Sequence, residues 1–276
     1  MDFNGIDPVE NEEQSRNPFR NHRLRRGVYL LPTFLTVGNL LCGYYAILAT
    51  LEGQLADFDN AAKAIGIAIV CDTLDGRVAR LMRTNSELGK ELDSLADVIS
   101  FGVAPAFLAY AWGVRAMALA SGAETSHLLQ IGWLVGFFYL GCSVWRLARF
   151  NIQGMAPGSS RYFVGMPTPA AAGLIAATVH FFEYPISDAR VSALWLLIVM
   201  ALGVLMSSTL RHYSFKEIQW ARRYPSLAVV LLAVLVGGIV RFSRPVLLAI
   251  AVPYSVHGIV LQLVRMARQR TASRHA

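Results

Sequence analysis

The sequence predicts an all-α fold, a polytopic membrane bundle of about eight transmembrane helices, from three observations. Hydrophobic residues make up 55% of the 276-residue chain, charged residues only 16%, and the mean hydropathy is +0.45. The apolar residues gather into segments close to the length of about 20 residues that crosses a bilayer. Most basic residues lie between these segments or at the chain ends. Such a composition excludes an ordinary soluble domain.

Three regions follow from the order of these segments. Residues 1–26 begin acidic and become basic, and are expected to be a disordered to juxtamembrane cytoplasmic segment. Residues 27–210 form the predicted helical core, and 211–276 add two further transmembrane helices and a basic cytoplasmic tail. The expected helices span residues 32–51, 59–83, 90–119, 127–153, 167–184, 190–210, 225–241 and 245–265.

The distribution of charge predicts the orientation. With eight spans, the loops rich in Arg and Lys fall on one side, which should be the cytoplasm. Arg241 and Arg244 are exceptions, because they lie in a short loop on the opposite side. The net charge of +7 is then explained by anionic lipid headgroups and topology. No nucleic-acid partner is expected. The five tryptophans lie mostly near segment ends and are interpreted as interfacial anchors.

Four aspartates interrupt the second and third apolar segments. An ionised carboxylate at bilayer depth costs at least ~2.5 kcal/mol on insertion scales, so each requires compensation. On a helix, Asp72 and Asp75 share one face, and Asp93 and Asp97 share a face with Gly89. Packing of the two faces would bring four carboxylates together. Interhelical polar contacts alone are the alternative interpretation.

The chemistry of these side chains predicts a metal centre. Oxygen ligands without a nearby His or Cys suit the hard cations Mg²⁺ or Mn²⁺. Four carboxylates fit two such ions about 3.5–4 Å apart, the arrangement that assists phosphoryl transfer. A cation-transport site is the alternative from another class of protein. The predicted metal ligands are Asp72, Asp75, Asp93 and Asp97.

The same faces leave space for a substrate. Gly76 and Gly89 have no side chains, so a flat or bulky group can approach the backbone there. Arg80 lies about 12 Å along the helix from Asp72. That position suits a second phosphate or a nucleotide edge.

The full pattern resembles the signature of a known family. Asp72-x2-Asp75-Gly76-x2-Ala79-Arg80-x8-Gly89-x3-Asp93-x3-Asp97 matches the CDP-alcohol phosphotransferases at all eight fixed positions. The resemblance implies an integral membrane enzyme, expected to be a homodimer, that transfers a phosphatidyl-type group from a CDP-linked lipid to an alcohol and releases CMP. It implies that Asp97 is both a metal ligand and the catalytic base. Carried over, the CDP-diacylglycerol site comprises Gly76, Ala79, Arg80, Ser86 and Gly89.

Asn39, inside the first predicted helix, has two open interpretations. It could donate an interhelical hydrogen bond to the helix that carries Asp72. It could instead contact the CDP group, because relatives often carry a polar residue at this point.

Three further runs resemble the bacterial type II phosphatidylserine synthases, and the likeness covers about residues 28–180. The resemblance implies CDP-diacylglycerol and L-serine as substrates and a bacterial inner-membrane location, and the distribution of charge predicts that the site faces the cytoplasm. Inositol phosphate, glycerol phosphate or choline remain open as acceptors. The runs are S-F-G-V-A-P-A from Ser100, R-L-A-R-F-N from Arg146 and G-M-P-T-P-A-A-A from Gly165.

The predicted serine site lies at the cytoplasmic end of the fourth helix. A guanidinium can hold the carboxylate of serine with two parallel bonds, and Arg149, followed by Asn151, is favoured for this role. Arg146 is interpreted as an anchor at the membrane surface. Thr168 could present its hydroxyl to a substrate or cap the helix that begins there.

Overall fold

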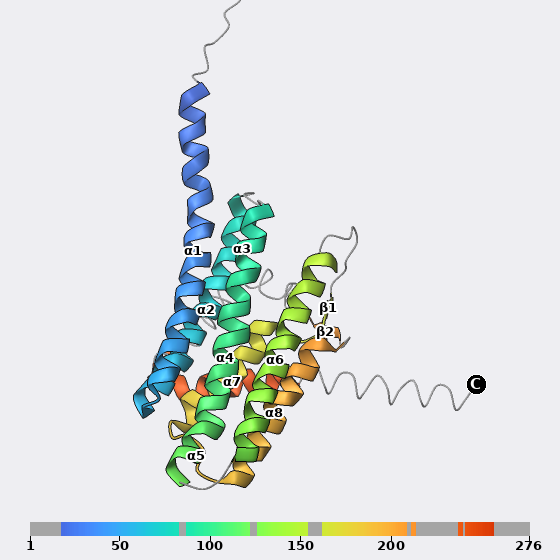
Figure 1. Cartoon of the computed structure of the whole chain (residues 1–276). Helices are drawn as coiled ribbons and strands as arrows, with labels where there is room; N and C mark the ends of the chain where they lie inside the picture. The colour runs from blue at the N-terminus through green and yellow to red at the C-terminus, as the bar shows by residue number, and fades with distance from the viewer. Residues whose placement is uncertain are drawn as a thin grey trace, which may run out of the picture.

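The computed structural model describes residues 18–82, 87–121, 126–153, 162–208, 211–213, 237–239 and 241–256. Helices that run roughly lengthwise beside one another form a bundle, beyond which α1 projects at its N-terminal end (Figure 1). The prediction of an all-α membrane bundle is confirmed. The helices are α1 (Pro18–Glu52), α2 (Leu55–Met82), α6 (Ser126–Gln153), α7 (Thr168–Phe182), α8 (Ala189–Ser207) and a last helix, Ser243–Val256, besides the segmented helix given below.

The structure differs from the predicted elements in two respects. The first helix begins at Pro18, so it includes part of the segment expected to precede the membrane. A short antiparallel ribbon, β1 (Tyr162–Val164) with β2 (Arg211–Tyr213), was not expected. Residues 1–17 and most of the expected helix 225–241 lie outside the described residues.

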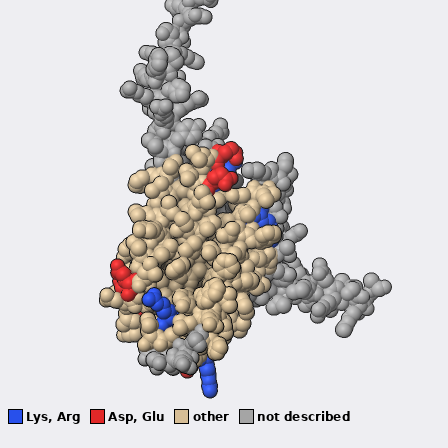
Figure 2. All heavy atoms as spheres, viewed as in Figure 1, with Lys and Arg blue, Asp and Glu red and all other residues tan. Residues whose placement is uncertain are grey.

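Four of the described helices are long and apolar enough to cross a membrane. They cover Thr33–Glu52, Glu87–Leu119, His127–Ile152 and Ala189–Ser207, whereas α7 and Ser243–Val256 are shorter. The face seen in Figure 2 is consistent with helices that cross a membrane, because its charged side chains form a few small groups with broad uncharged surface between them. The chain is therefore an integral membrane protein, and the number of eight spans stays a prediction.

The third long helix consists of five consecutive segments. Two are π-helical, and they interrupt α-helical geometry without breaking the helix. Pro105 follows the first π-helical segment and has no N–H to offer the Phe101 carbonyl, which instead accepts a hydrogen bond from the Tyr139 hydroxyl of α6 at 3.1 Å. The segments are α3 (Glu87–Asp97), η1 (Val98–Val103), α4 (Ala104–Tyr110), η2 (Ala111–Arg115) and α5 (Ala116–Ser121).

The interpretation of all five tryptophans as interfacial anchors is wrong for two of them. Trp112 and Trp195 are buried, with ring centroids 5.2 Å apart in an edge-to-face arrangement. The Trp195 indole N–H donates to the Ala109 carbonyl at 2.9 Å. Both therefore join α8 to the segmented helix inside the bundle, since proximity to a segment end does not determine which way a ring points.

Close packing of α1 against η1 fixes the backbone next to Asp97. A Cβ atom at Gly43 would lie 2.8 Å from the Ser100 Cα, a contact that the backbone must move to relieve. We expect Gly43→Ala to lower the melting temperature in detergent, since overpacking costs about 1–3 kcal/mol, and to reduce activity. Gly66→Ala is the matched control, because nothing lies within 4 Å of the added atom. Equal melting temperatures for the two variants would contradict this packing.

Candidate active site

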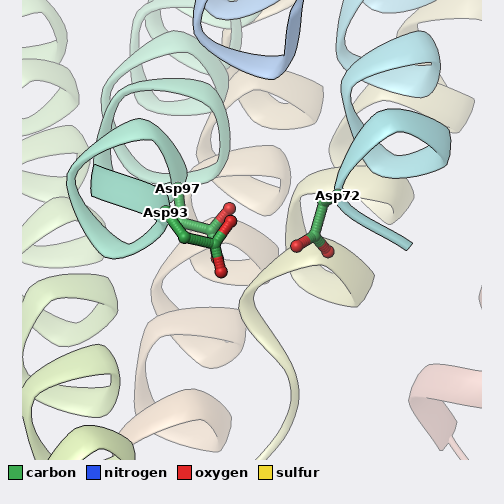
Figure 3. Close-up of side chains that lie close together, drawn as sticks. All are labelled: Asp72, Asp93 and Asp97. Carbon is green, nitrogen blue, oxygen red and sulfur yellow. The ribbon is translucent and has the colours of Figure 1, made fainter. Parts of the chain in front are cut away.

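Three carboxylates from two helices converge in the structure. Asp72 extends from α2, and Asp93 and Asp97 extend from α3 toward it (Figure 3). One oxygen of each carboxylate lies within 4.8 Å of an oxygen of the other two. The spacing of four residues on α3 places Asp93 and Asp97 on one face, as the sequence predicts.

The fourth predicted ligand, Asp75, also lies near this group but is held by another helix. Its buried carboxylate accepts a hydrogen bond from the Thr36 hydroxyl of α1. It remains an electrostatic neighbour of Asp72 and Asp93. Asp75 is therefore placed at the edge of the cluster, where α1 meets α2.

Asp97 is held by a contact from α1, and a second contact joins α1 to η1. The Asn39 side-chain amide donates to Asp97 Oδ1 at 3.0 Å, and the Ser100 hydroxyl donates to the Asn39 carbonyl at 2.8 Å. Asn39 thus contacts the α3 helix rather than the Asp72 helix, whereas the CDP contact stays a prediction. Buried Asn39 Oδ1 has no partner among the described residues, so a donor group is still required there.

The predicted CDP-diacylglycerol residues lie beside the acidic cluster where they are described. Gly76 and Ala79 continue the α2 face that carries Asp72, and Gly89 precedes Asp93 by one turn of α3; all three are partly buried. The Arg80 side chain and Ser86 lie outside the described residues. Their nucleotide-binding roles stay predictions.

Arg146, interpreted from sequence as a surface anchor, lies inside the bundle. The side chain is buried and donates from Nη1 to the Thr168 hydroxyl at 3.4 Å. It is also an electrostatic neighbour of Asp97. Its Nε has no partner among the described residues, although it is buried. A buried guanidinium with an unused donor can bind an anionic group.

The other predicted serine-site residues make contacts within the protein. Arg149 donates to the Ser207 and Ser208 carbonyls, each at 3.1 Å, and cations are favourable at a helix C-terminus such as that of α8. Asn151 donates to the Ser94 hydroxyl at 2.8 Å and so joins α6 to α3. Thr168 is the first residue of α7, directly after the N-cap Pro167, and its hydroxyl accepts from Arg146.

The donor set fits a divalent cation. All ligand candidates are carboxylate oxygens, which hard cations prefer. Asp93 Oδ1 is buried with no hydrogen-bond partner among the described residues. Close carboxylates also repel one another, and a cation would relieve that repulsion. Asp72, Asp93 and Asp97, with Asp75 beside them, can therefore hold a metal ion.

Comparison with known proteins identifies the family. The family model described as CDP-alcohol phosphatidyltransferase matches residues 29–207, which include every residue of the acidic cluster. The chain belongs to this family. The match also covers Asn39, Arg146 and Thr168, so the contacts around the cluster all lie within the family core.

The similar proteins include three named CDP-diacylglycerol–serine O-phosphatidyltransferase. The protein from Helicobacter pylori is 34% identical over 87% of this chain and 94% of its own length. That from Mycobacterium leprae is 33% identical over 85% and 76%. The Bacillus subtilis protein is 32% identical over 68% and 92%. The chain is thus an enzyme of this family, similar over most of its length to proteins of that name.

Proposed function

We propose that the protein transfers the phosphatidyl group of CDP-diacylglycerol to the hydroxyl of L-serine, giving phosphatidylserine and CMP. The observation that carries the proposal is the converging group of Asp72, Asp93 and Asp97 beside buried Arg146. This arrangement supports the proposal that cations binding the phosphates lie next to the group that binds the acceptor's carboxylate. The names of the relatives favour serine, and the family favours an enzyme over a cation transporter.

In the reaction, Asp97 accepts the proton of the serine hydroxyl. The serine oxygen forms a bond to the lipid-linked phosphorus as the bond from that phosphorus to the CMP oxygen breaks. CMP leaves with the electron pair of that bond. The amide of Asn39 holds the Asp97 carboxylate in a fixed orientation, which supports its action as the base.

Two divalent cations, Mg²⁺ or Mn²⁺, are proposed to bind at Asp72, Asp75, Asp93 and Asp97. When bound, they supply positive charge that neutralises the pyrophosphate and makes the acceptor alcohol easier to deprotonate. Gly76, Ala79, Arg80, Ser86 and Gly89 are proposed to line the CDP-diacylglycerol site. The cluster is proposed to face the cytoplasm of a bacterial inner membrane, and a homodimer is proposed from the family resemblance.

The acceptor contact is proposed at Arg146, with Thr168 beside it. This replaces the sequence-based preference for Arg149, because Arg149 donates to carbonyls at the end of α8. Asn151 is proposed to hold α3 and α6 together near the site through Ser94.

An acceptor panel tests the function. Purified protein in detergent receives CDP-diacylglycerol, Mg²⁺ or Mn²⁺ and one of serine, choline, glycerol phosphate or inositol phosphate. Of the four acceptors, we expect only serine to give rapid CMP release, with phosphatidylserine as the lipid product. Faster release with one of the other alcohols would overturn serine as the acceptor.

The two arginines should differ in their effects. We expect Arg146→Ala to raise the KM for serine roughly 10- to 150-fold, since a hydrogen bond to a charged group contributes about 1.5–3 kcal/mol, and to leave the KM for CDP-diacylglycerol nearly unchanged. Arg146→Lys should recover only part, because an ammonium cannot make the two-point contact. Arg149→Ala should mainly lower the melting temperature. A selective serine KM effect in Arg149→Ala, with none in Arg146→Ala, would restore Arg149 as the contact.

A further inference from the structure

The Asn39 carboxamide lies against the proposed base and has one unused atom. Its Nδ2 donates to Asp97 Oδ1 at 3.0 Å. Charge requires this orientation, because the reverse would place the amide oxygen against a carboxylate oxygen, and both of these atoms only accept. Asn39 is fully buried, and its Oδ1 has no hydrogen-bond partner among the described residues. A buried acceptor of this kind requires a donor.

Contacts of α1 with its neighbours hold this amide in place. The Ser100 hydroxyl of η1 donates to the Asn39 backbone carbonyl at 2.8 Å. Thr36, one turn earlier on α1, donates to the Asp75 carboxylate of α2. Gly43, one turn later, lies so close to Ser100 that a Cβ atom has no room. Rotation or sliding of α1 would disturb all of these contacts, so the direction of the unused oxygen is fixed.

The unused oxygen is close to the group that is proposed to take the proton. Within a carboxamide, the oxygen and the nitrogen are about 2.2 Å apart. Since Nδ2 is 3.0 Å from Asp97 Oδ1, at most about 5 Å separates Asn39 Oδ1 from that carboxylate oxygen. Serine carries its hydroxyl and its ammonium on adjacent carbon atoms. A serine whose hydroxyl bonds Asp97 therefore brings its ammonium within hydrogen-bond reach of Asn39 Oδ1.

The other substrate has no such donor close to the reaction centre. In CDP-diacylglycerol, the donors of the ribose and the cytosine lie beyond the second phosphate, several bonds from the lipid-linked phosphorus. The acceptor hydroxyl attacks that phosphorus, so these donors are further from Asp97 than the serine ammonium is. An ammonium also carries a charge and three donors, and charge-assisted hydrogen bonds are the stronger ones.

We propose that Asn39 Oδ1 accepts a hydrogen bond from the acceptor's ammonium group, so that Asn39 selects alcohols with an N–H donor beside the hydroxyl. This rests on the proposed function. One carboxamide orients both partners of the proton transfer, because Nδ2 holds the Asp97 carboxylate and Oδ1 holds the serine. The quaternary nitrogen of choline has no N–H, and glycerol phosphate and inositol phosphate have no nitrogen. Asn39 is thus a specificity-determining residue.

The test separates recognition of the ammonium from orientation of Asp97. The probe is 3-hydroxypropanoate, which is serine without its ammonium and which, as a competitor of serine, gives a binding constant whether or not it reacts. We define the ammonium preference as the ratio of this constant to the KM for serine. Asn39→Ala should lower the preference roughly 10- to 100-fold, since it removes a hydrogen bond to a charged group. A change in the orientation of Asp97 alone would alter the kcat and leave the preference unchanged.

Two further full-length variants serve as controls, with melting temperatures to show that each is folded. Asn39→Asp keeps an acceptor oxygen in either protonation state, so its preference should stay within about threefold of the wild type whatever its kcat. Asn60→Ala makes the same change as Asn39→Ala on α2, about 18 Å along the helix from Asp72. It should leave both constants unchanged.

The wild type supplies a measurement that needs no variant. It should bind serine at least about tenfold more tightly than 3-hydroxypropanoate, and equal binding of the two would overturn the proposal. An unchanged preference in Asn39→Ala would also overturn it. If the KM for CDP-diacylglycerol then rises instead, the unused oxygen belongs to the nucleotide site. An equal loss of preference in Asn39→Asp and Asn39→Ala would show that the acceptor oxygen is not what selects the ammonium.

Failure of the proposed function is distinguishable from failure of this proposal. If the wild type uses serine and Asn39→Ala keeps the ammonium preference, only the role of Asn39 fails. If the wild type itself prefers an acceptor without an ammonium, the assignment of serine fails in the acceptor panel, before any variant is compared.

Discussion

Asp93→Asn is expected to lower CMP release by more than about a hundredfold. The substitution removes a charged oxygen ligand whose neighbours are the Asp72 and Asp97 carboxylates. Loss of an outer partner of a metal site alone costs about 10- to 100-fold, and loss of a ligand should cost more. EDTA should abolish the wild-type activity, and added Mg²⁺ or Mn²⁺ should restore it.

A neighbouring carboxylate supplies the control for this prediction. Glu91 is on the same helix but exposed, so Glu91→Gln should keep nearly full activity. The melting temperature of each variant without metal shows whether the fold is retained. Activity that persists in Asp93→Asn, or after thorough chelation of the wild type, would refute the metal mechanism.

The second large effect is expected for Asp97→Asn. The variant keeps the shape and one oxygen that can accept from Asn39, but it cannot accept the serine proton. A general base contributes about 10²- to 10⁴-fold, so the kcat should fall by that factor. The affinity for CDP-diacylglycerol, measured by binding without serine, should stay within about threefold of the wild type.

A kcat for Asp97→Asn within about tenfold of the wild type, or about 1.4 kcal/mol in barrier, would show that Asp97 is not the base. A matched loss of lipid binding and turnover would instead assign Asp97 to the metal site alone. Asn39→Ala separates positioning from proton transfer, because the carboxylate remains. Its kcat should fall by less than that of Asp97→Asn.

The sequence predicts the acidic cluster well because helical spacing determines which residues share a face. Asp93 and Asp97 are one turn apart, and a membrane helix cannot leave such groups facing lipid. Spacing does not determine which neighbouring helix each side chain meets. Asp75 therefore bonds Thr36 of α1, and Asn39 bonds Asp97 rather than the helix of Asp72.

The acceptor site shows the same limit more strongly. Arg146 and Arg149 are three residues apart at the end of one helix, and both fit the pattern of basic residues at a membrane surface. The two side chains have different partners on α7 and α8, because Arg146 bonds Thr168 and Arg149 bonds the end of α8. No sequence pattern in α6, α7 or α8 indicates which of these helices each arginine contacts.

The remaining surprises are local features of the backbone. A proline inside a helix removes a backbone hydrogen bond, but the sequence does not indicate that a π-helical segment and a hydrogen bond from Tyr139 occur next to Pro105. From the sequence, the last helix is recognised only as an apolar segment. Its attachment to α7 depends on the contact of Ser243 with His180, which is more than 60 residues away in sequence.

The measurement that tests the central claim most directly uses L-serine labelled with ¹⁸O at the hydroxyl. The protein is given this serine, CDP-diacylglycerol and a divalent cation, and the products are analysed by mass spectrometry. Attack by the serine oxygen on the lipid-linked phosphorus predicts phosphatidylserine that retains the label and CMP that carries none. Phosphatidylserine without the label, label in CMP, or CMP release that does not depend on serine would contradict the account.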